Sequence, residues 1–217
     1  MNSLKDFLPL RCFLSQFDKD GIECSLPTGF VLKWCSTNLV EFDLQDKKES
    51  ILQEKGTGTA TYINKTEDEI VVIDYENLIH SLPQRINAGK RAPKCCDFIV
   101  YSNDGSSFFI CNELSSSETK TKWPDARNQF GDTIRRILKC SETKKVLDLY
   151  KQKLCILSTK IKNIISPDDM AAPFTIPFTL MKKPEKLAWS IIENMNFEIW
   201  EANLIVYEDE QVSVFVR

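Results

Sequence analysis

The sequence has few of the features that would place it in a specialised class of protein. Its 217 residues include only 7 glycines and 9 prolines, which excludes collagen-like and low-complexity chains. No apolar run approaches the roughly 20 residues that a membrane-spanning helix requires. The first residues show no basic segment followed by an apolar one, so no secretory signal is expected. We therefore expect a globular, cytoplasmic protein that does not act at a membrane.

The net charge is also small, and the chain has a single histidine. The chain carries 28 Lys and Arg residues against 31 Asp and Glu residues, for a net charge of −3, so its overall charge does not attract nucleic acid. This balance leaves room for a local basic patch. The single histidine, His80, and the absence of a Gly-x-Ser-x-Gly turn argue against a Ser-His-Asp hydrolase.

Cysteine is common, but its spacing is not that of a usual zinc site. None of the eight cysteines forms a Cys-x-x-Cys pair. Cys95 and Cys96 are adjacent, and neighbouring side chains of a strand point to opposite faces, so this pair does not suit a shared zinc ion. In a cytoplasmic protein disulfides are not expected either. We expect buried free thiols.

The spacing of apolar residues predicts an α/β protein with a mixed central β-sheet flanked by helices. β-branched and aromatic residues predict two hairpins, one formed by 57–64 and 69–75 and the other by 97–101 and 108–114. Apolar residues at helical spacing predict helices over 125–140 and 142–150.

The remaining elements are predicted from shorter signals, and the whole chain, 1–217, is interpreted as a single domain. The expected elements are a short charged helix over 46–55, a buried strand over 154–157, a loop over 166–183, a helix beginning at Pro184, and a closing antiparallel pair of 204–207 and 212–216.

Two acidic residues of the second hairpin are expected to converge. If the hairpin is symmetric about Asp104, Glu113 is the diagonal neighbour of Asp97, and both side chains lie on one otherwise apolar face. Two carboxylates so close together repel each other and lose hydration. This arrangement costs free energy unless a cation lies between them. A hard divalent ion with oxygen ligands suits such a pair. A register shift of one residue would separate them.

The order of elements around this pair resembles the core of the PD-(D/E)xK, or restriction-endonuclease-like, nuclease superfamily. In that family the signature Asp opens the second strand and a Glu-x-Lys tripeptide ends the third, and here Asp97 and Glu113 take those positions. One helix before the strands, and a helix and a strand after them, complete the likeness over residues 45–160. The resemblance implies a restriction-endonuclease-like core with extra N-terminal and C-terminal elements, the latter a helix plus a β-hairpin over 184–217.

The resemblance also implies a divalent-metal site and catalytic residues. Asp97 and Glu113 would be catalytic and would bind Mg²⁺, or Mn²⁺ in its place. Gln129 matches a glutamine that many members carry early in the second helix, and it joins the catalytic set.

One position departs from the family pattern. Ser115 stands where the motif has its lysine, and a serine cannot supply a positive charge. Lys94 is the expected catalytic replacement, with Lys120 and Lys122 as further candidates. The alternative is that the fold is kept while cleavage is weak or lost.

Basic residues near the motif are the candidate contacts for nucleic acid phosphates. They are Arg85, Lys90, Arg91, Lys120 and Lys122. By resemblance, the protein is expected to act on nucleic acid phosphodiesters, with DNA as the expected partner, in defence against foreign DNA or in DNA processing. A homodimer or a partner subunit is the expected assembly.

Two other functions stay open. The protein can be an inactive nuclease-fold subunit that binds nucleic acid or another protein. It can also be a small interaction or regulatory protein, in which Asp97 marks only the start of a strand and Glu113 lies on an exposed edge.

Overall fold

The computed structural model describes residues 3–19, 22–24, 26–45, 50–82, 84–86, 93–115, 123–159 and 184–216. These parts of the chain form six helices and fourteen strands. None of these helices is long and apolar enough to cross a membrane.

The strands form two mixed sheets and a small ribbon. The larger sheet has seven strands in the order β11 (Glu185–Leu187), β12 (Glu198–Glu201), β10 (Gln152–Thr159), β9 (Phe108–Ser115), β8 (Phe98–Ser102), β6 (Ile70–Asp74) and β2 (Trp34–Thr37). The smaller sheet has five strands in the order β14 (Gln211–Phe215), β13 (Leu204–Glu208), β5 (Ala60–Asn64), β3 (Glu41–Leu44) and β4 (Leu52–Gln53). The ribbon pairs β1 (Ile22–Cys24) with β7 (Gln84–Ile86).

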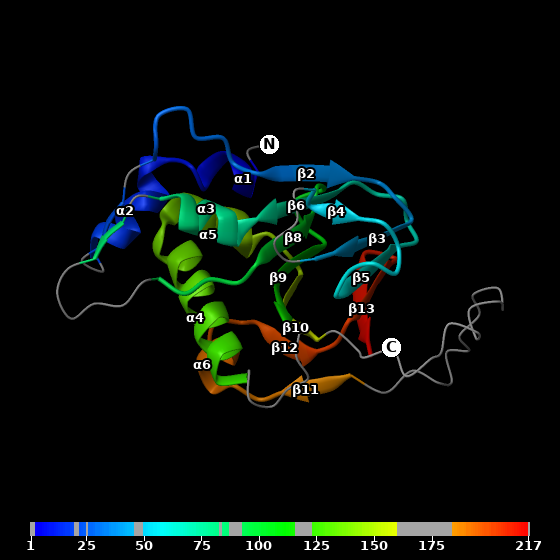
Figure 1. The fold of residues 1–217 in the computed structure, drawn as a ribbon. Coiled ribbons are helices and arrows are strands. Elements are labelled where there is room, and N and C mark those ends of the chain that lie inside the picture. Colours follow the sequence, from blue (N-terminus) through cyan, green and yellow to red (C-terminus); the bar gives the residue numbers. More distant parts are fainter. Residues whose placement is uncertain are drawn as a thin grey trace.

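The larger sheet is the middle layer of the molecule (Figure 1). Six helices pack on one of its faces: α1 (Leu4–Phe7), α2 (Arg11–Lys19), α3 (Tyr75–Ser81), α4 (Trp123–Lys139), α5 (Ser141–Asp148) and α6 (Ser190–Glu193). The five-stranded sheet packs on the other face. The central strands are therefore buried on both sides.

Side chains of the central strands alternate between two cores. Odd-numbered residues such as Ile99 and Cys111 belong to the core beneath the helices. Even-numbered residues such as Val100 and Ile110 belong to the core between the two sheets. This alternation assigns each residue of the hairpin to one side of the sheet.

A polar network lies inside the core between the sheets. Asn112 is fully buried; the Tyr62 hydroxyl donates to its Oδ1 at 2.9 Å, and its Nδ2 donates to the Ile156 carbonyl at 2.9 Å and to Ser158 Oγ at 3.0 Å. The network joins β5 of the smaller sheet to β9 and β10 of the larger one.

The turn of the second hairpin is organised by one carboxylate. Asp104 accepts hydrogen bonds from the Ser102 and Ser107 hydroxyls and from the backbone N–H groups of Ser106 and Ser107. Burial alone would raise the pKa of Asp104, but these hydrogen bonds lower it to about 2. The turn is thereby held in one geometry, which fixes the register of β8 against β9.

The α/β class is confirmed, with two mixed sheets in place of the single central sheet that was predicted. The second hairpin is confirmed as β8 and β9, the two long helices as α4 and α5, and the closing pair as β13 and β14. The strand predicted over 154–157 is the centre of the longer β10. The loop predicted over 166–183 lies outside the described residues.

The prediction that 57–64 and 69–75 pair as a hairpin is wrong. Both strands exist, as β5 and β6, but they belong to different sheets. β5 pairs with β3 on one edge and with β13 on the other, and β6 pairs with β2 and β8 in the same way. The short connection between them carries the chain from one sheet to the other. At its first end Asn64 N–H donates to Val40 O, before β3, and at its second end Glu69 O accepts from Asn103 N–H, after β8.

The helix predicted over 46–55 is also wrong in its described part, because Leu52–Gln53 is strand β4, paired with β3. Ile51 is buried in the core between the sheets, and the Lys55 ammonium binds the Glu41 carboxylate at 2.8 Å. The charged residues thus interact across strands and not along a helix.

The helix predicted from Pro184 is replaced by strand β11 and the short helix α6, because Leu187 and Ile192 bury their side chains from two separate elements. Strand β12 and helix α3 were not predicted. Both are short, and α3, at 7 residues, offers too few turns for a periodic signal.

We predict that Tyr62→Phe destabilises the protein by about 1–3 kcal/mol, because it leaves the buried Oδ1 of Asn112 without its donor. Tyr207→Phe is the matched control, since the Tyr207 hydroxyl donates at 3.3 Å to Asp68, an exposed residue whose carboxylate water can satisfy in its place. Urea unfolding of both variants measures the difference. Equal stabilities for the two variants would contradict a structural role for the network.

Candidate active site

The register of the second hairpin brings Asp97 and Glu113 to the same level. Phe98 pairs with Asn112 and Ile99 with Cys111, so Asp97, the residue before β8, lies opposite Glu113. The predicted register was two residues different, which made the two acids diagonal neighbours. A shift of two residues keeps both side chains on the same face, so the predicted face is retained and the pair is closer than predicted.

A hydrogen bond ties the Asp97 side chain to the end of β9. The backbone N–H of Leu114 donates to Asp97 Oδ2 at 2.6 Å. The carboxylate therefore takes the place of a backbone acceptor, one residue beyond the last pair of the ladder. Asp97 is only 6% exposed, and Oε2 of Glu113 is buried as well. Both acids lie at the boundary of the core beneath the helices.

Helix α3 adds a third carboxylate that the sequence analysis missed. The backbone N–H groups of Tyr75 and Glu76 donate to the carbonyl of Asp97 at 2.9 and 3.1 Å, so α3 begins beside Asp97. Asp74 caps this helix by accepting from Asn77 N–H at 3.0 Å. An Asp at the N-cap followed by a Glu in the first turn is a signal for a helix start, and it could have revealed Glu76.

The pKa of the Cys95 thiol shows that the three carboxylates lie near one another. Burial raises the pKa of its thiol, and the neighbouring Cys96 together with the negative charges of Glu76, Asp97 and Glu113 raises it further. Three carboxylates thus act on one buried thiol.

A fourth acid extends the row across the sheet. Leu157 of β10 pairs with Glu113 on one side and with Glu201 of β12 on the other, and these three strands are parallel. Leu157 faces the helices, so both glutamates do too. The indole N–H of Trp123, at the start of α4, donates to Glu201 Oε2 at 3.1 Å. Ligand sites of open α/β sheets lie at the carboxyl ends of parallel strands, where this row is found.

The structure places Gln129 and Lys94 differently. The Thr133 hydroxyl of α4 accepts from Cys96 N–H at 3.1 Å, and Gln129 lies one turn earlier on the same stripe of the helix, partly buried. The Lys94 ammonium binds Asp125 Oδ1 at 2.7 Å. Gln129 thus shares a stripe of α4 with Thr133, whose hydroxyl contacts the residue before Asp97, whereas Lys94 is held by a carboxylate at the start of α4.

The other candidates divide between described and undescribed parts. Ser115 is the last residue of β9, 6% exposed, and shares the face of Glu113. The backbone of Arg85 pairs with Glu23 in the ribbon of β1 and β7. Lys90, Arg91, Lys120 and Lys122 lie outside the described residues.

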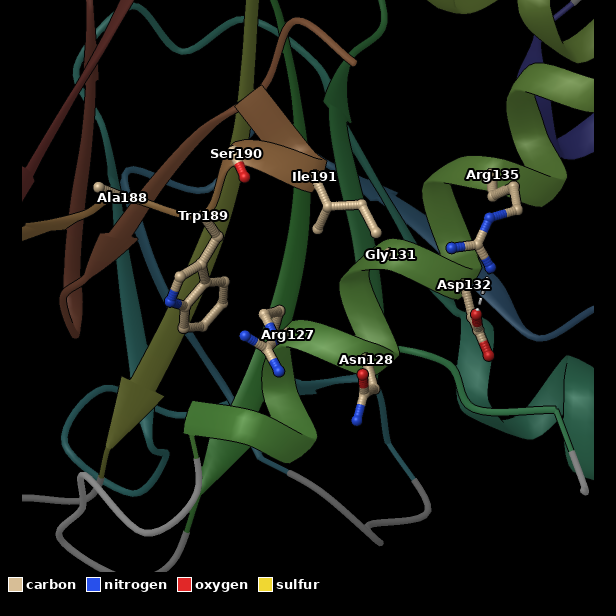
Figure 2. A pocket seen from close by; sticks show the side chains of 9 residues that line it. All are labelled: Arg127, Asn128, Gly131, Asp132, Arg135, Ala188, Trp189, Ser190 and Ile191. Carbon is tan, nitrogen blue, oxygen red and sulfur yellow. Dashed lines mark hydrogen bonds and ion pairs between the residues drawn. The ribbon is translucent and has the colours of Figure 1, made fainter. Parts of the chain in front are cut away.

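A groove runs along the other side of α4 (Figure 2). Its volume is about 310 Å³, and it is lined by Arg127, Asn128, Gly131, Asp132, Arg135, Ala188, Trp189, Ser190 and Ile191. The Trp189 indole projects toward α4, and Arg135 binds Asp132 Oδ1 at 2.7 Å. The two arginines are about 12 Å apart along the helix axis. This groove could not be predicted from the sequence because its two walls are far apart in the chain.

Comparison of the chain with models of protein families finds no match, and searches among curated proteins and among solved structures find none either.

We predict that Asp97→Ala destabilises the protein by about 1–3 kcal/mol, because it removes the acceptor of the partly buried Leu114 N–H. Asp97→Asn keeps an oxygen acceptor and should cost clearly less. Chemical unfolding of both variants measures the difference. If both variants cost the same, the bond to Leu114 contributes little, and the position of Asp97 has another cause.

Proposed function

We propose that this protein acts on nucleic acid phosphodiesters with a divalent metal ion held by Asp97 and Glu113. The observation that supports this most strongly is their placement at one level of the β8–β9 hairpin, with the Asp97 carboxylate anchored by Leu114 N–H. The resemblance to PD-(D/E)xK nucleases suggests the same two residues independently of their geometry.

The donor groups suit Mg²⁺ or Mn²⁺. Mg²⁺ prefers oxygen ligands and is commonly held by one or two carboxylates, with water and substrate phosphates completing its shell. Within the described parts of the chain, Asp97 and Glu113 do not belong to a compact group of three or more acidic, cysteine or histidine ligands. Two carboxylates would thus be the protein ligands, and a metal bound there would polarise the phosphate and activate water.

The protein's own residues would orient and support this chemistry. The Leu114 N–H fixes the direction of the Asp97 carboxylate before any ligand arrives. Gln129 offers an amide from the facing stripe of α4. Ser115 offers a hydroxyl where the family has an ammonium, so stabilisation of negative charge in the transition state is weaker.

The groove along α4 is the proposed path for the nucleic acid. Arg127 and Arg135 can contact phosphates, and the Trp189 indole is a stacking surface for a base. A groove of about 310 Å³ has the size of a small-ligand site, which favours a single strand over a duplex. α4 would thus hold one part of the strand in the groove, while another part of the same strand reaches the acids on the opposite side of the helix.

Two observations favour the alternative of an inactive subunit that binds nucleic acid. The motif lysine is replaced by Ser115, and Lys94 binds Asp125. Under this alternative the fold and the groove are kept while cleavage is lost. A role in defence against foreign DNA or in DNA processing, and assembly as a homodimer or with a partner subunit, are proposed from the resemblance.

We expect the wild-type protein to cleave DNA or RNA slowly in the presence of Mg²⁺ or Mn²⁺ and to stop when EDTA is added. Asp97→Asn and Glu113→Gln should each reduce the rate by about 10²-fold or more, because a metal ligand is lost. Glu208→Gln is the matched control, since this exposed carboxylate binds Lys65 at the end of β13. The assay uses plasmid, linear duplex, single-stranded DNA and RNA substrates.

Cleavage that survives both substitutions would contradict the assignment of Asp97 and Glu113. Where the wild type is silent, Ser115→Lys tests the missing charge, since the new ammonium would share the face of Glu113. Cleavage by this variant supports the site. Silence from both proteins, with binding retained, supports the inactive subunit.

We predict that Arg127→Ala and Arg135→Ala each weaken binding of a single-stranded oligonucleotide and reduce the slope of log K against log salt by about 0.7, the value for one lost phosphate contact. Gly131→Leu should block the groove, because Gly131 lines it and a Cβ at this position meets no atom within 4 Å, so the new side chain has space to enter. Lys144→Ala, an exposed cation of α5, is the control. Unchanged slopes, measured by fluorescence anisotropy, would exclude the groove as the path.

A further inference from the structure

The junction between α2 and the α4–α5 corner brings together two thiols and a carboxylate. Cys12 lies on α2, Cys140 is the N-cap of α5, and Glu142 lies in the first turn of α5. Their ligand atoms all lie within 4.8 Å of one another. The Cys140 thiol donates to Glu142 Oε2 at 3.3 Å. Cys12 is far from the other two in sequence, so no spacing motif announces the group.

The surrounding hydrogen bonds fix these side chains in place. The Ser141 hydroxyl donates to Glu142 Oε2 at 2.7 Å and so orients the carboxylate. The Thr143 hydroxyl is positioned to donate to the carbonyls of Ile137 and Cys140, at 2.6 and 3.2 Å, and this holds the α4–α5 corner. Hydrogen bonds of this kind around the ligands strengthen metal sites.

The group is open on one side. Cys140 is 1% exposed, whereas Cys12 and Glu142 are partly exposed. An ion can therefore reach the ligands from solvent. This burial gradient matches a site with three protein ligands and one solvent position.

The distances suit a tetrahedral zinc ion. Zinc lies about 2.3 Å from thiolate sulfur and about 2.0–2.2 Å from carboxylate oxygen, which places neighbouring ligand atoms about 3.6–3.8 Å apart. The Cys140–Glu142 pair is slightly closer than this, and no pair in the group exceeds 4.8 Å. Rotation of the side chains covers the remaining difference.

We propose that Cys12, Cys140 and Glu142 bind a zinc ion that clamps α2 to the α4–α5 corner. Binding would displace the two thiol protons to solvent and form two zinc–thiolate bonds and one zinc–carboxylate bond. Thiolate ligands select zinc over Mg²⁺, so this site is chemically distinct from the pair of Asp97 and Glu113. It does not depend on the proposed function.

Cobalt is the probe, because a tetrahedral thiolate–cobalt complex has a characteristic absorption spectrum. The full chain is stripped of metal, kept reduced with a non-thiol phosphine and titrated with Co²⁺ and then Zn²⁺. We expect one equivalent of Co²⁺ to give thiolate charge-transfer bands that Zn²⁺ abolishes. Cys12→Ser, Cys140→Ser and Glu142→Gln should each weaken binding by about tenfold or more, whereas Cys35→Ser, which changes a thiol outside the group, should not.

A second measurement uses the wild-type chain alone, so it stands even if a variant fails to fold. Zn²⁺ at saturating concentration should protect Cys12 and Cys140 from alkylation, read by mass spectrometry, and should raise the melting temperature, whereas Mg²⁺ should do neither. The proposal is overturned if cobalt binds without thiolate bands, or if the two cysteines are alkylated equally with and without zinc.

Discussion

Burial of the seven-stranded sheet on both faces is the constraint on which the rest of the structure depends. Every residue of β8 is buried, and helices and a second sheet enclose β9 and β10. Each side chain of these strands must therefore belong to one of two cores. Asp97 and Glu113 fall on the side of the helices because of this alternation, and the same alternation places Asn112 between the sheets. The acidic face and the polar network are two results of one packing arrangement.

Sequence patterns predicted the elements whose signals are long and local. The β8–β9 hairpin and helix α4 follow from alternation and from the spacing of Ala126, Phe130 and Ile134, and the face of Asp97 and Glu113 followed from the same alternation. The partners of β5 and β6 could not be predicted, because each strand pairs with strands that do not follow it directly in the chain. The charged residues near Leu52 suggested a helix. They belong to a strand region instead, and the partner of Lys55, Glu41, lies on another strand, which the local sequence does not reveal.

The site was predicted in part for the same reason. Asp97 and Glu113 are joined by a hairpin, so local alternation sufficed. Glu76 and Glu201 reach the same region through the start of α3 and through parallel pairing with β10, and neither relation is visible in a linear pattern. Lys94 was close to Asp97 in sequence, yet its long side chain extends to Asp125 of another element. The position of a lysine in the chain therefore does not determine which carboxylate its long side chain reaches.

The outer strands of the larger sheet have a consequence for assembly. β2 and β11 contain 4 and 3 residues, so each offers few unpaired backbone groups to an incoming strand. The Lys5 ammonium of α1 lies 3.4 Å from the centre of the Trp34 ring of β2 and places a positive charge at that border. Continuous sheet formation between copies is thereby disfavoured at both borders. At these two borders a second chain would have to associate through side-chain surfaces, whose shape and charge select one partner, whereas backbone pairing would accept any strand.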